Sequence, residues 1–313
     1  MSDELPDSLD LTPPFDAPPP PDRHVWRGLG IAESGDFVPL DWECFTTATL
    51  LDGVKLLTNT PVVSIARQFI DGILPGRPFD PKGIVVRLHC TPHDAPHQTG
   101  QQVFDDHRGV IAELLDRGVD KFELHNEPNV VSDGWKSVHW SSAGEFVDEW
   151  YTPLARAIRD EFKFNAVKPQ LIFPGLTPSF GEDDPGRSVF EWFPHIHRAI
   201  ADGLVDGVGV HCYWQNAAQM RDKNNGLYFL HFIEQDFGKP LWITEFSNNK
   251  TEQGEDDVAK GTEYKQYFDL LREHPQIMGA YAFALRSDQQ EFNDRRETWA
   301  RDGKVTDIAR QLV

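Results

Sequence analysis

The sequence contains little cysteine, with three residues of this type in a chain of 313. Cys44, Cys90 and Cys212 are far apart, and an odd number leaves at least one thiol unpaired. This scarcity excludes the disulfide framework of a small secreted domain and is compatible with a reducing compartment.

Positive charge is also scarce. The chain has 30 Lys and Arg residues against 50 Asp and Glu residues, a formal net charge of −20, and no cluster of basic residues. Proteins that bind nucleic acid neutralise phosphates with grouped Lys and Arg, and an anionic membrane surface repels an acidic protein. We therefore expect neither nucleic acid nor a membrane as a partner.

Long apolar runs are missing, since no stretch approaches the ~20 residues of a membrane-spanning helix. The first residues are acidic and rich in proline, without the basic and apolar regions of a signal peptide. We predict a disordered or loosely attached tail over residues 1–24 and one domain over residues 25–313. The expected location is the cytoplasm, or the outside of the cell after export without such a signal.

Eight short runs with the apolar character of buried strands follow the tail. They are Trp26–Ala32, Val54–Asn59, Gly83–Cys90, Lys121–Asn126, Pro169–Pro174, Gly207–Trp214, Pro240–Phe246 and Gly279–Leu285. Segments with a helical period of apolar residues separate them. These are one helix within Gly35–Gly53, then Val62–Ile73, Val103–Arg117, Ala143–Phe162, Val189–Ala201, Asn225–Phe237, Val258–Glu273 and Val305–Leu312.

This alternation predicts an α/β protein with parallel strands and right-handed crossovers. Eight such units close naturally into a (β/α)8 TIM barrel, which we expect as a single domain. An open doubly wound sheet is the alternative. It is disfavoured because no glycine-rich phosphate-binding motif follows the first strand.

Two glutamates stand at the carboxyl ends of predicted strands, where barrel enzymes place their catalytic groups. Glu127 stands in His125-Asn126-Glu127-Pro128, and Glu245 in Ile243-Thr244-Glu245-Phe246. Both side chains are therefore expected at the same rim. Two facing carboxylates are what glycosidic cleavage requires, because one protonates the leaving oxygen while the other attacks or stabilises the anomeric centre.

The segments FELHNEPN and LWITEF, with His-x-Tyr at the sixth strand, resemble the clan A glycoside hydrolases. These are retaining (β/α)8 enzymes such as cellulases, β-xylosidases and β-1,3-glucanases. The resemblance implies a glycosidase without cofactor or metal, in which Glu127 is the acid/base and Glu245 the nucleophile. A retaining mechanism predicts carboxyl groups about 5–5.5 Å apart.

The resemblance also implies roles for neighbouring residues. Asn126 is expected to bind the sugar 2-hydroxyl, Tyr213 to hold Glu245 ionised, and His211 to line the same pocket. Arg87 is a further candidate partner of Glu245, although the clan usually places such an arginine one strand earlier. Glu123 shares the face of Glu127, and we expect it to pair with a buried arginine such as Arg87.

Aromatic residues near the strand ends are candidates for stacking against sugar rings. Trp135 and Trp140 follow the fourth strand, Trp214 and Phe246 end the sixth and seventh, and Phe180 lies after the fifth. His89, at the end of the third strand, is a further candidate for the substrate pocket.

Two alternatives remain open. The first is an inactive carbohydrate-binding or structural barrel. The second is a metal-dependent hydrolase that uses the loop His89–His97, where three histidines and Cys90 stand close together. Prolines in that loop break the helix on which such spacing would converge, so we predict no metal. The expected partner is an oligo- or polysaccharide, a neutral β-glycan rather than a uronic-acid polymer, because the acidic surface repels an anionic chain.

Overall fold

The computed structural model of the chain describes residues 24–31, 38–58, 62–72, 78–88, 98–136, 140–249, 256–286 and 297–313. Its centre is a closed barrel of eight parallel strands in sequence order. The strands are β1 (Trp26–Gly30), β2 (Gly53–Leu57), β3 (Ile84–Leu88), β4 (Lys121–Leu124), β5 (Gln170–Leu176), β6 (Gly207–Trp214), β7 (Leu241–Asn248) and β8 (Ile277–Ala282). The predicted (β/α)8 barrel is therefore confirmed.

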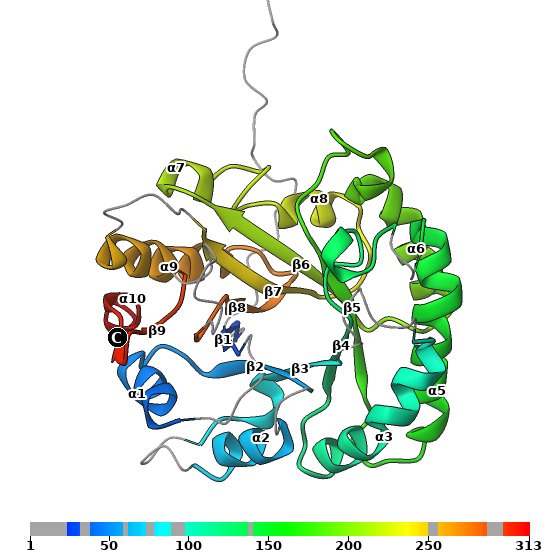
Figure 1. Cartoon of the computed structure of the whole chain (residues 1–313), viewed down its shortest axis with the longest axis horizontal. Helices are drawn as coiled ribbons and strands as arrows, with labels where there is room; N and C mark the ends of the chain where they lie inside the picture. Colours follow the sequence, from blue (N-terminus) through cyan, green and yellow to red (C-terminus); the bar gives the residue numbers. More distant parts are fainter. Residues whose placement is uncertain are drawn as a thin grey trace, which may run out of the picture.

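Helices surround the barrel (Figure 1). They are α1 (Pro39–Thr47), α2 (Val62–Ile70), α3 (Gly100–Asp116), α4 (Ala143–Glu145), α5 (Thr152–Glu161), α6 (Val189–Ala201), α7 (Ala217–Met220), α8 (Phe229–Glu234), α9 (Asp257–Leu271) and α10 (Asp307–Arg310). A π-helical segment, η3 (Phe146–Tyr151), joins α4 to α5. It interrupts the single regular helix predicted there. Short 3₁₀ turns are η1 (Pro81–Gly83), η2 (Val131–Asp133) and η4 (Pro185–Arg187), and a two-stranded antiparallel sheet pairs β9 (Ala300–Arg301) with β10 (Lys304–Val305).

Local sequence signals explain where α3 begins. Thr99 precedes the helix, and its hydroxyl accepts a hydrogen bond from the backbone N–H of Gln102. The Gln102 side chain in turn accepts one from the backbone N–H of Thr99. This reciprocal cap satisfies two amide groups that the first helical turn leaves without partners.

The barrel has apolar packing on both sides of its wall. A large core lies between the strands and the surrounding helices, and a small inner cluster contains Val85, Ile172, Trp242 and Tyr281. Along β3, Arg87 follows Val85 by two residues and so shares its inward face. The interior therefore changes from apolar to charged toward the carboxyl ends of the strands.

The division into a tail of residues 1–24 and a domain of residues 25–313 stays a prediction, since residues 1–23 lie outside the described part. Among the described residues, no helix combines the length and apolar character needed to cross a bilayer.

Candidate active site

The turn after β4 holds Glu127 in an uncommon backbone conformation. His125 has φ 91° and Glu127 has φ 24°, in the left-handed region that non-glycine residues rarely adopt. Such outliers concentrate at functional sites, because the surrounding structure must stabilise them. Two contacts hold the Glu127 carboxylate in place. His211 Nδ1 lies 2.6 Å from Glu127 Oε1, and the Thr177 hydroxyl donates to the same oxygen.

A bulge in β7 directs Glu245 into the barrel. Ile243 and Phe246 both pack in the outer core, while Trp242 packs in the inner cluster. Thr244 and Glu245 both stand between the outward-facing Ile243 and Phe246, whereas a regular strand would have one residue between two outward positions. The pairing with β6 shows the same irregularity, because Val210 pairs with Ile243 and His211 with Glu245. The extra residue turns Glu245 inward, as bulges beside active sites commonly do.

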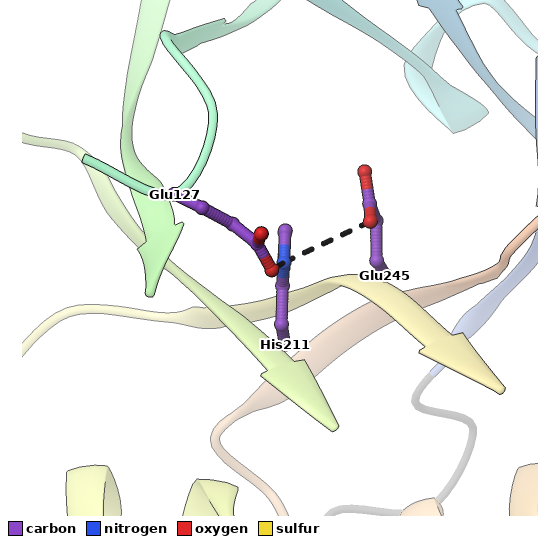
Figure 2. A group of neighbouring side chains, drawn as sticks. All are labelled: Glu127, His211 and Glu245. Carbon is purple, nitrogen blue, oxygen red and sulfur yellow. Dashed lines mark hydrogen bonds and ion pairs between the residues drawn. The ribbon is translucent and has the colours of Figure 1, made fainter. Parts of the chain in front are cut away.

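The bulge and the turn bring the two predicted carboxylates together. Figure 2 shows the side chains of Glu127, His211 and Glu245 converging, with a dashed line to Glu245 from the point where His211 meets Glu127. One carboxylate oxygen of each glutamate and a ring nitrogen of His211 lie within 4.8 Å of one another. His211 Nδ1 is 3.8 Å from Glu245 Oε2. The two glutamates predicted from separate strands thus form one site.

Cations and a phenol surround the Glu245 carboxylate. Arg87 Nη1 lies 2.7 Å and Lys55 Nζ 3.2 Å from Oε1, and the Tyr213 hydroxyl donates to Oε2 at 2.7 Å. Burial alone would raise the pKa of Glu245, but Lys55, His211 and Arg87 outweigh it and hold that pKa well below its usual value. The carboxylate is therefore ionised, and the predicted contacts of Arg87 and Tyr213 with Glu245 are confirmed.

Lys55 is a site residue that we did not predict. Its side chain is buried on β2 and lies 2.8 Å from Glu123 Oε2, as well as next to Glu245. Glu123, expected to pair with Arg87, therefore pairs with Lys55, and its other oxygen accepts from the backbone N–H of Gly175 at 3.2 Å. A lysine within the apolar segment GVKLL was the available signal, because lysine is rarely buried unless it is paired.

His211 is fully buried between the two glutamates. Burial lowers the pKa of its imidazole, but the charges of Glu245 and Glu127 have the larger combined effect and raise that pKa above its usual value. Space for the ring comes from Gly175, where an added Cβ would lie 2.2 Å from His211 Cδ2. The structure thus places His211 against both glutamates, and its role in lining a substrate pocket stays a prediction.

Asn126 connects the site to a further acid that we did not predict. Its side-chain oxygen accepts from Arg87, and its amide nitrogen lies 3.4 Å from Asp133 Oδ2. Burial and the nearby charge of Glu127 raise the pKa of Asp133 to about 7. The role of Asn126 toward a sugar stays a prediction.

The predicted stacking of aromatic rings on sugar is wrong for four of the five candidates. Trp135, Trp140, Trp214 and Phe246 are each at most 2% exposed. Trp214 and Phe246 occupy outward-facing strand positions and stack on each other at 5.8 Å, and the Trp135 indole N–H donates to Asp184. Phe180 alone among the five is substantially exposed, at 36%.

Two groups of side chains are candidates for binding a metal ion. His89, Cys90 and the rest of the His89–His97 loop lie outside the described residues. Among the described residues, Glu127, His211 and Glu245 are close enough to share an ion. However, Arg87 and Lys55 both contact Glu245 Oε1, so a metal cation there would face two fixed positive charges. This donor set suits a pair of reacting carboxylates better than a metal.

Comparison with known proteins identifies the family to which the chain belongs. The family model of the glycosyl hydrolase catalytic core matches residues 93–311, which include both glutamates. The match covers more than half of the chain, so the chain belongs to this family, and it is a glycosidase by that membership. No curated protein sequence matches the chain.

Solved structures show the same fold. An endo-β-1,3-glucanase of family GH128 from Sorangium cellulosum is 18% identical with a TM-score of 0.55, covering 92% of this chain and 97% of that one. A GH128 endo-β-1,3-glucanase from Amycolatopsis mediterranei, solved with laminaripentaose, is 11% identical with a TM-score of 0.54, covering 92% and 98%. A glucosidase from Croceicoccus marinus is 11% identical with a TM-score of 0.61, covering 92% and 66%. At these identities the likeness establishes the fold alone.

Proposed function

We propose that this member of the glycosyl hydrolase catalytic core family cleaves β-glycosidic bonds with retention of configuration. Glu245 would be the nucleophile and Glu127 the general acid/base. The observation that carries the proposal is the approach of the two carboxylates, whose nearest oxygens lie within 4.8 Å of each other at the mouth of the barrel. Their surroundings differ in the way that two different roles require.

In the first step, Glu245 attacks the anomeric carbon while Glu127 gives its proton to the leaving oxygen. The bond from the anomeric carbon to the leaving oxygen breaks as the bond to Glu245 forms. Arg87, Lys55 and Tyr213 keep Glu245 ionised and direct its oxygens. In the second step, Glu127 takes a proton from water, and the water oxygen displaces Glu245.

The spacing of the carboxylates favours retention over inversion. Inverting enzymes hold the two carboxyl groups about 6.5–9.5 Å apart to admit a water, whereas retaining enzymes hold them about 5–5.5 Å apart. An oxygen of each glutamate lies within 4.8 Å of one of the other, which is compatible with the shorter range.

The substrate that we propose is a neutral β-glycan, with β-1,3-glucan as the first candidate. Several proteins of similar fold are β-1,3-glucanases, and the one from Amycolatopsis mediterranei was solved with laminari-oligosaccharides. The net charge of −20 agrees with an uncharged polysaccharide, because a polyuronate would be repelled at low salt.

Kinetics of glutamine variants test the proposal. On laminari-oligosaccharides, Glu127→Gln should lower kcat about 10²–10⁴-fold, and Glu245→Gln should lower it at least as much. An aryl β-glycoside with a good leaving group needs no proton for the first step. Glu127→Gln should therefore slow the glycosylation step less on this substrate than on laminari-oligosaccharides. The control Glu113→Gln removes only a surface ion pair on α3 and should match the parent.

Two outcomes would contradict the assignment. Unchanged activity in both site variants would exclude these residues as catalysts, and loss of activity on treatment with a chelator would favour a metal-dependent hydrolase. A parent protein that binds laminari-oligosaccharides but cleaves none would instead support the inactive carbohydrate-binding barrel.

A further inference from the structure

A hollow lined by side-chain amides adjoins the two glutamates. It measures about 290 Å³ and is lined by Thr177, Pro178, Tyr213, Trp214, Gln215, Gln219, Asn224, Asn225 and Asn249. We call it the amide hollow. Its volume is at the lower end of the range of about 300–1,000 Å³ for small-molecule sites, which suits a single sugar unit.

Two residues of the lining connect the amide hollow to the catalytic pair. Thr177 follows β5, and its hydroxyl donates to Glu127. Tyr213, near the end of β6, donates to Glu245. A ligand in the hollow therefore lies one residue away from each carboxylate, at the carboxyl ends of β5, β6 and β7.

The lining contains amides where a site for an anion would contain Lys or Arg, and none of its side chains carries a charge. Each amide offers both a donor and an acceptor, which is the combination that a sugar hydroxyl also presents. An uncharged polyhydroxyl ligand matches this lining better than a phosphate, a carboxylate or a cation.

Several of the amides are already held in place. Gln219 Oε1 accepts from the backbone N–H of Gln215 at 2.8 Å, and Asn225 Nδ2 donates to Asp222 at 2.9 Å. Within the described part of the chain, the opposite ends of these two amides make no hydrogen bond. Their free ends are thus oriented before a ligand arrives, which reduces the entropy lost on binding.

Asn249 provides an independent observation. Its Oδ1 atom is buried and has no hydrogen-bond partner among the described residues. Asn249 lines the hollow, and buried acceptors in folded proteins are nearly always satisfied, so this acceptor at the edge of the hollow indicates a missing donor. A sugar hydroxyl can supply that donor.

The position of Asn126, which does not line the hollow, indicates which sugar unit the hollow receives. The proposed acid gives its proton to the oxygen of the departing sugar, so that sugar lies on the side of Glu127. Asn126, the expected partner of the other sugar's 2-hydroxyl, instead contacts Arg87 and Asp133, on the side of β3 and β4.

We propose that the amide hollow binds the sugar unit on the leaving-group side of the cleaved bond, and that Gln219, Asn225 and Asn249 select an uncharged sugar there. The inference rests on the proposed glycosidase function and adds the residues that recognise the leaving sugar.

Asn249→Ala and Gln219→Ala test this inference by comparing two substrates. Laminari-oligosaccharides place a sugar in the hollow, whereas an aryl β-glycoside places an aromatic leaving group near it. Each variant should lower the ratio of kcat/KM on the oligosaccharide to kcat/KM on the aryl glycoside about tenfold, the effect of losing one hydrogen bond. Gln101→Ala, which removes an exposed amide on α3, should leave the ratio unchanged.

A ratio that stays at the parental value in both variants would overturn the inference, whereas parental inactivity on both substrates would count against the proposed function instead. In that case, titration of laminaritriose into the Glu245→Gln protein shows whether the hollow binds a sugar. Binding that Asn249→Ala weakens about tenfold supports the inference. Absence of binding, or binding insensitive to Asn249→Ala, overturns it.

Discussion

At the residue scale, the site is a compact set of buried charges in which each ionised group has an opposite partner. Lys55 lies between Glu123 and Glu245, and Arg87 contacts Glu245 from the neighbouring strand. Removing one partner of a buried pair leaves an uncompensated charge, which costs about 3–5 kcal/mol. The set therefore couples the ionisation of Glu245 to the stability of the barrel.

Lys55→Met is expected to lower the free energy of unfolding by about 3–5 kcal/mol, because it leaves Glu123 unpaired in the interior. It also removes a cation that keeps the pKa of Glu245 low, so the acid limb of the pH profile of kcat/KM should move to higher pH. Denaturant unfolding and pH-dependent kinetics measure the two effects.

The double variant Lys55→Met with Glu123→Gln separates these effects. It removes both charges of one pair, so most of the lost stability should return while the acid limb stays displaced. An acid limb unchanged from the parent in both proteins would show that Lys55 has only a structural role.

At this scale, the sequence supports some predictions and not others. Glu127 and Glu245 follow recognisable strand-end motifs, and Tyr213 lies two residues after His211 on one strand face. Lys55 was detectable as a lone lysine in a buried strand. Asp133 was not, because its position depends on the loop after β4, whose course no periodicity predicts.

At the element scale, irregularities in the strands orient the catalytic groups. Regular alternation from Leu241 and Ile243 would turn Glu245 toward the helices, and the bulge in β7 reverses this. Alternation alone does predict that Trp214 faces outward, because it stands two positions after the outward-facing Cys212. We did not apply this rule when we predicted that Trp214 stacks on a sugar. A bulge, by contrast, depends on pairing with neighbouring strands, which one segment of sequence does not reveal.

Gly175→Ala is expected to disturb His211 through packing alone. The added Cβ would lie 2.2 Å from Cδ2 and 2.3 Å from Nε2 of His211, and 2.6 Å from Thr244 Oγ1. We predict a loss of about 1–3 kcal/mol in the free energy of unfolding, together with reduced kcat/KM as the contact between His211 and Glu127 is displaced. Denaturant unfolding and steady-state kinetics measure both.

Gly109→Ala is the matched control for this variant. An added Cβ at Gly109 in α3 meets nothing within 4 Å among the described residues, and alanine favours a helix interior by about 0.5–1 kcal/mol. It should therefore be neutral or stabilising. Equal effects of the two substitutions would contradict the packing argument at Gly175.

At the scale of the whole molecule, the order of eight strands and intervening helices was predictable, because apolar periodicity and chain length leave few alternatives to a closed barrel. The strand ends were less predictable: β8 is Ile277–Ala282, whereas Gly279–Leu285 was expected. The net charge of −20 predicted only which partners the protein would repel. It did not predict which carboxylates the fold turns inward and pairs with Lys55 and Arg87.

Stability should fall as pH rises through the range in which Asp133 loses its proton. The folded chain holds this proton up to about pH 7, whereas the usual pKa of the group is 3.8, so the folded state binds more protons between these values. His211 acts in the same direction, because its raised pKa contributes stability below pH 6.5 that is lost at higher pH. Asp133→Asn should flatten the pH dependence of the unfolding midpoint between about pH 4 and pH 7. A midpoint profile identical to that of the parent would contradict the burial of a protonated Asp133.

The proposed mechanism depends on a covalent bond between Glu245 and the sugar, and mass spectrometry can detect this bond in a trapped intermediate. A 2-deoxy-2-fluoro laminaribiosyl donor with a good leaving group slows the second step, so the glycosyl-enzyme should accumulate. We expect one added disaccharide on the intact protein, located on Glu245 after proteolysis and absent from Glu245→Gln. Hydrolysis of laminari-oligosaccharides by the parent, with the label on another residue or with product of inverted configuration, would contradict it.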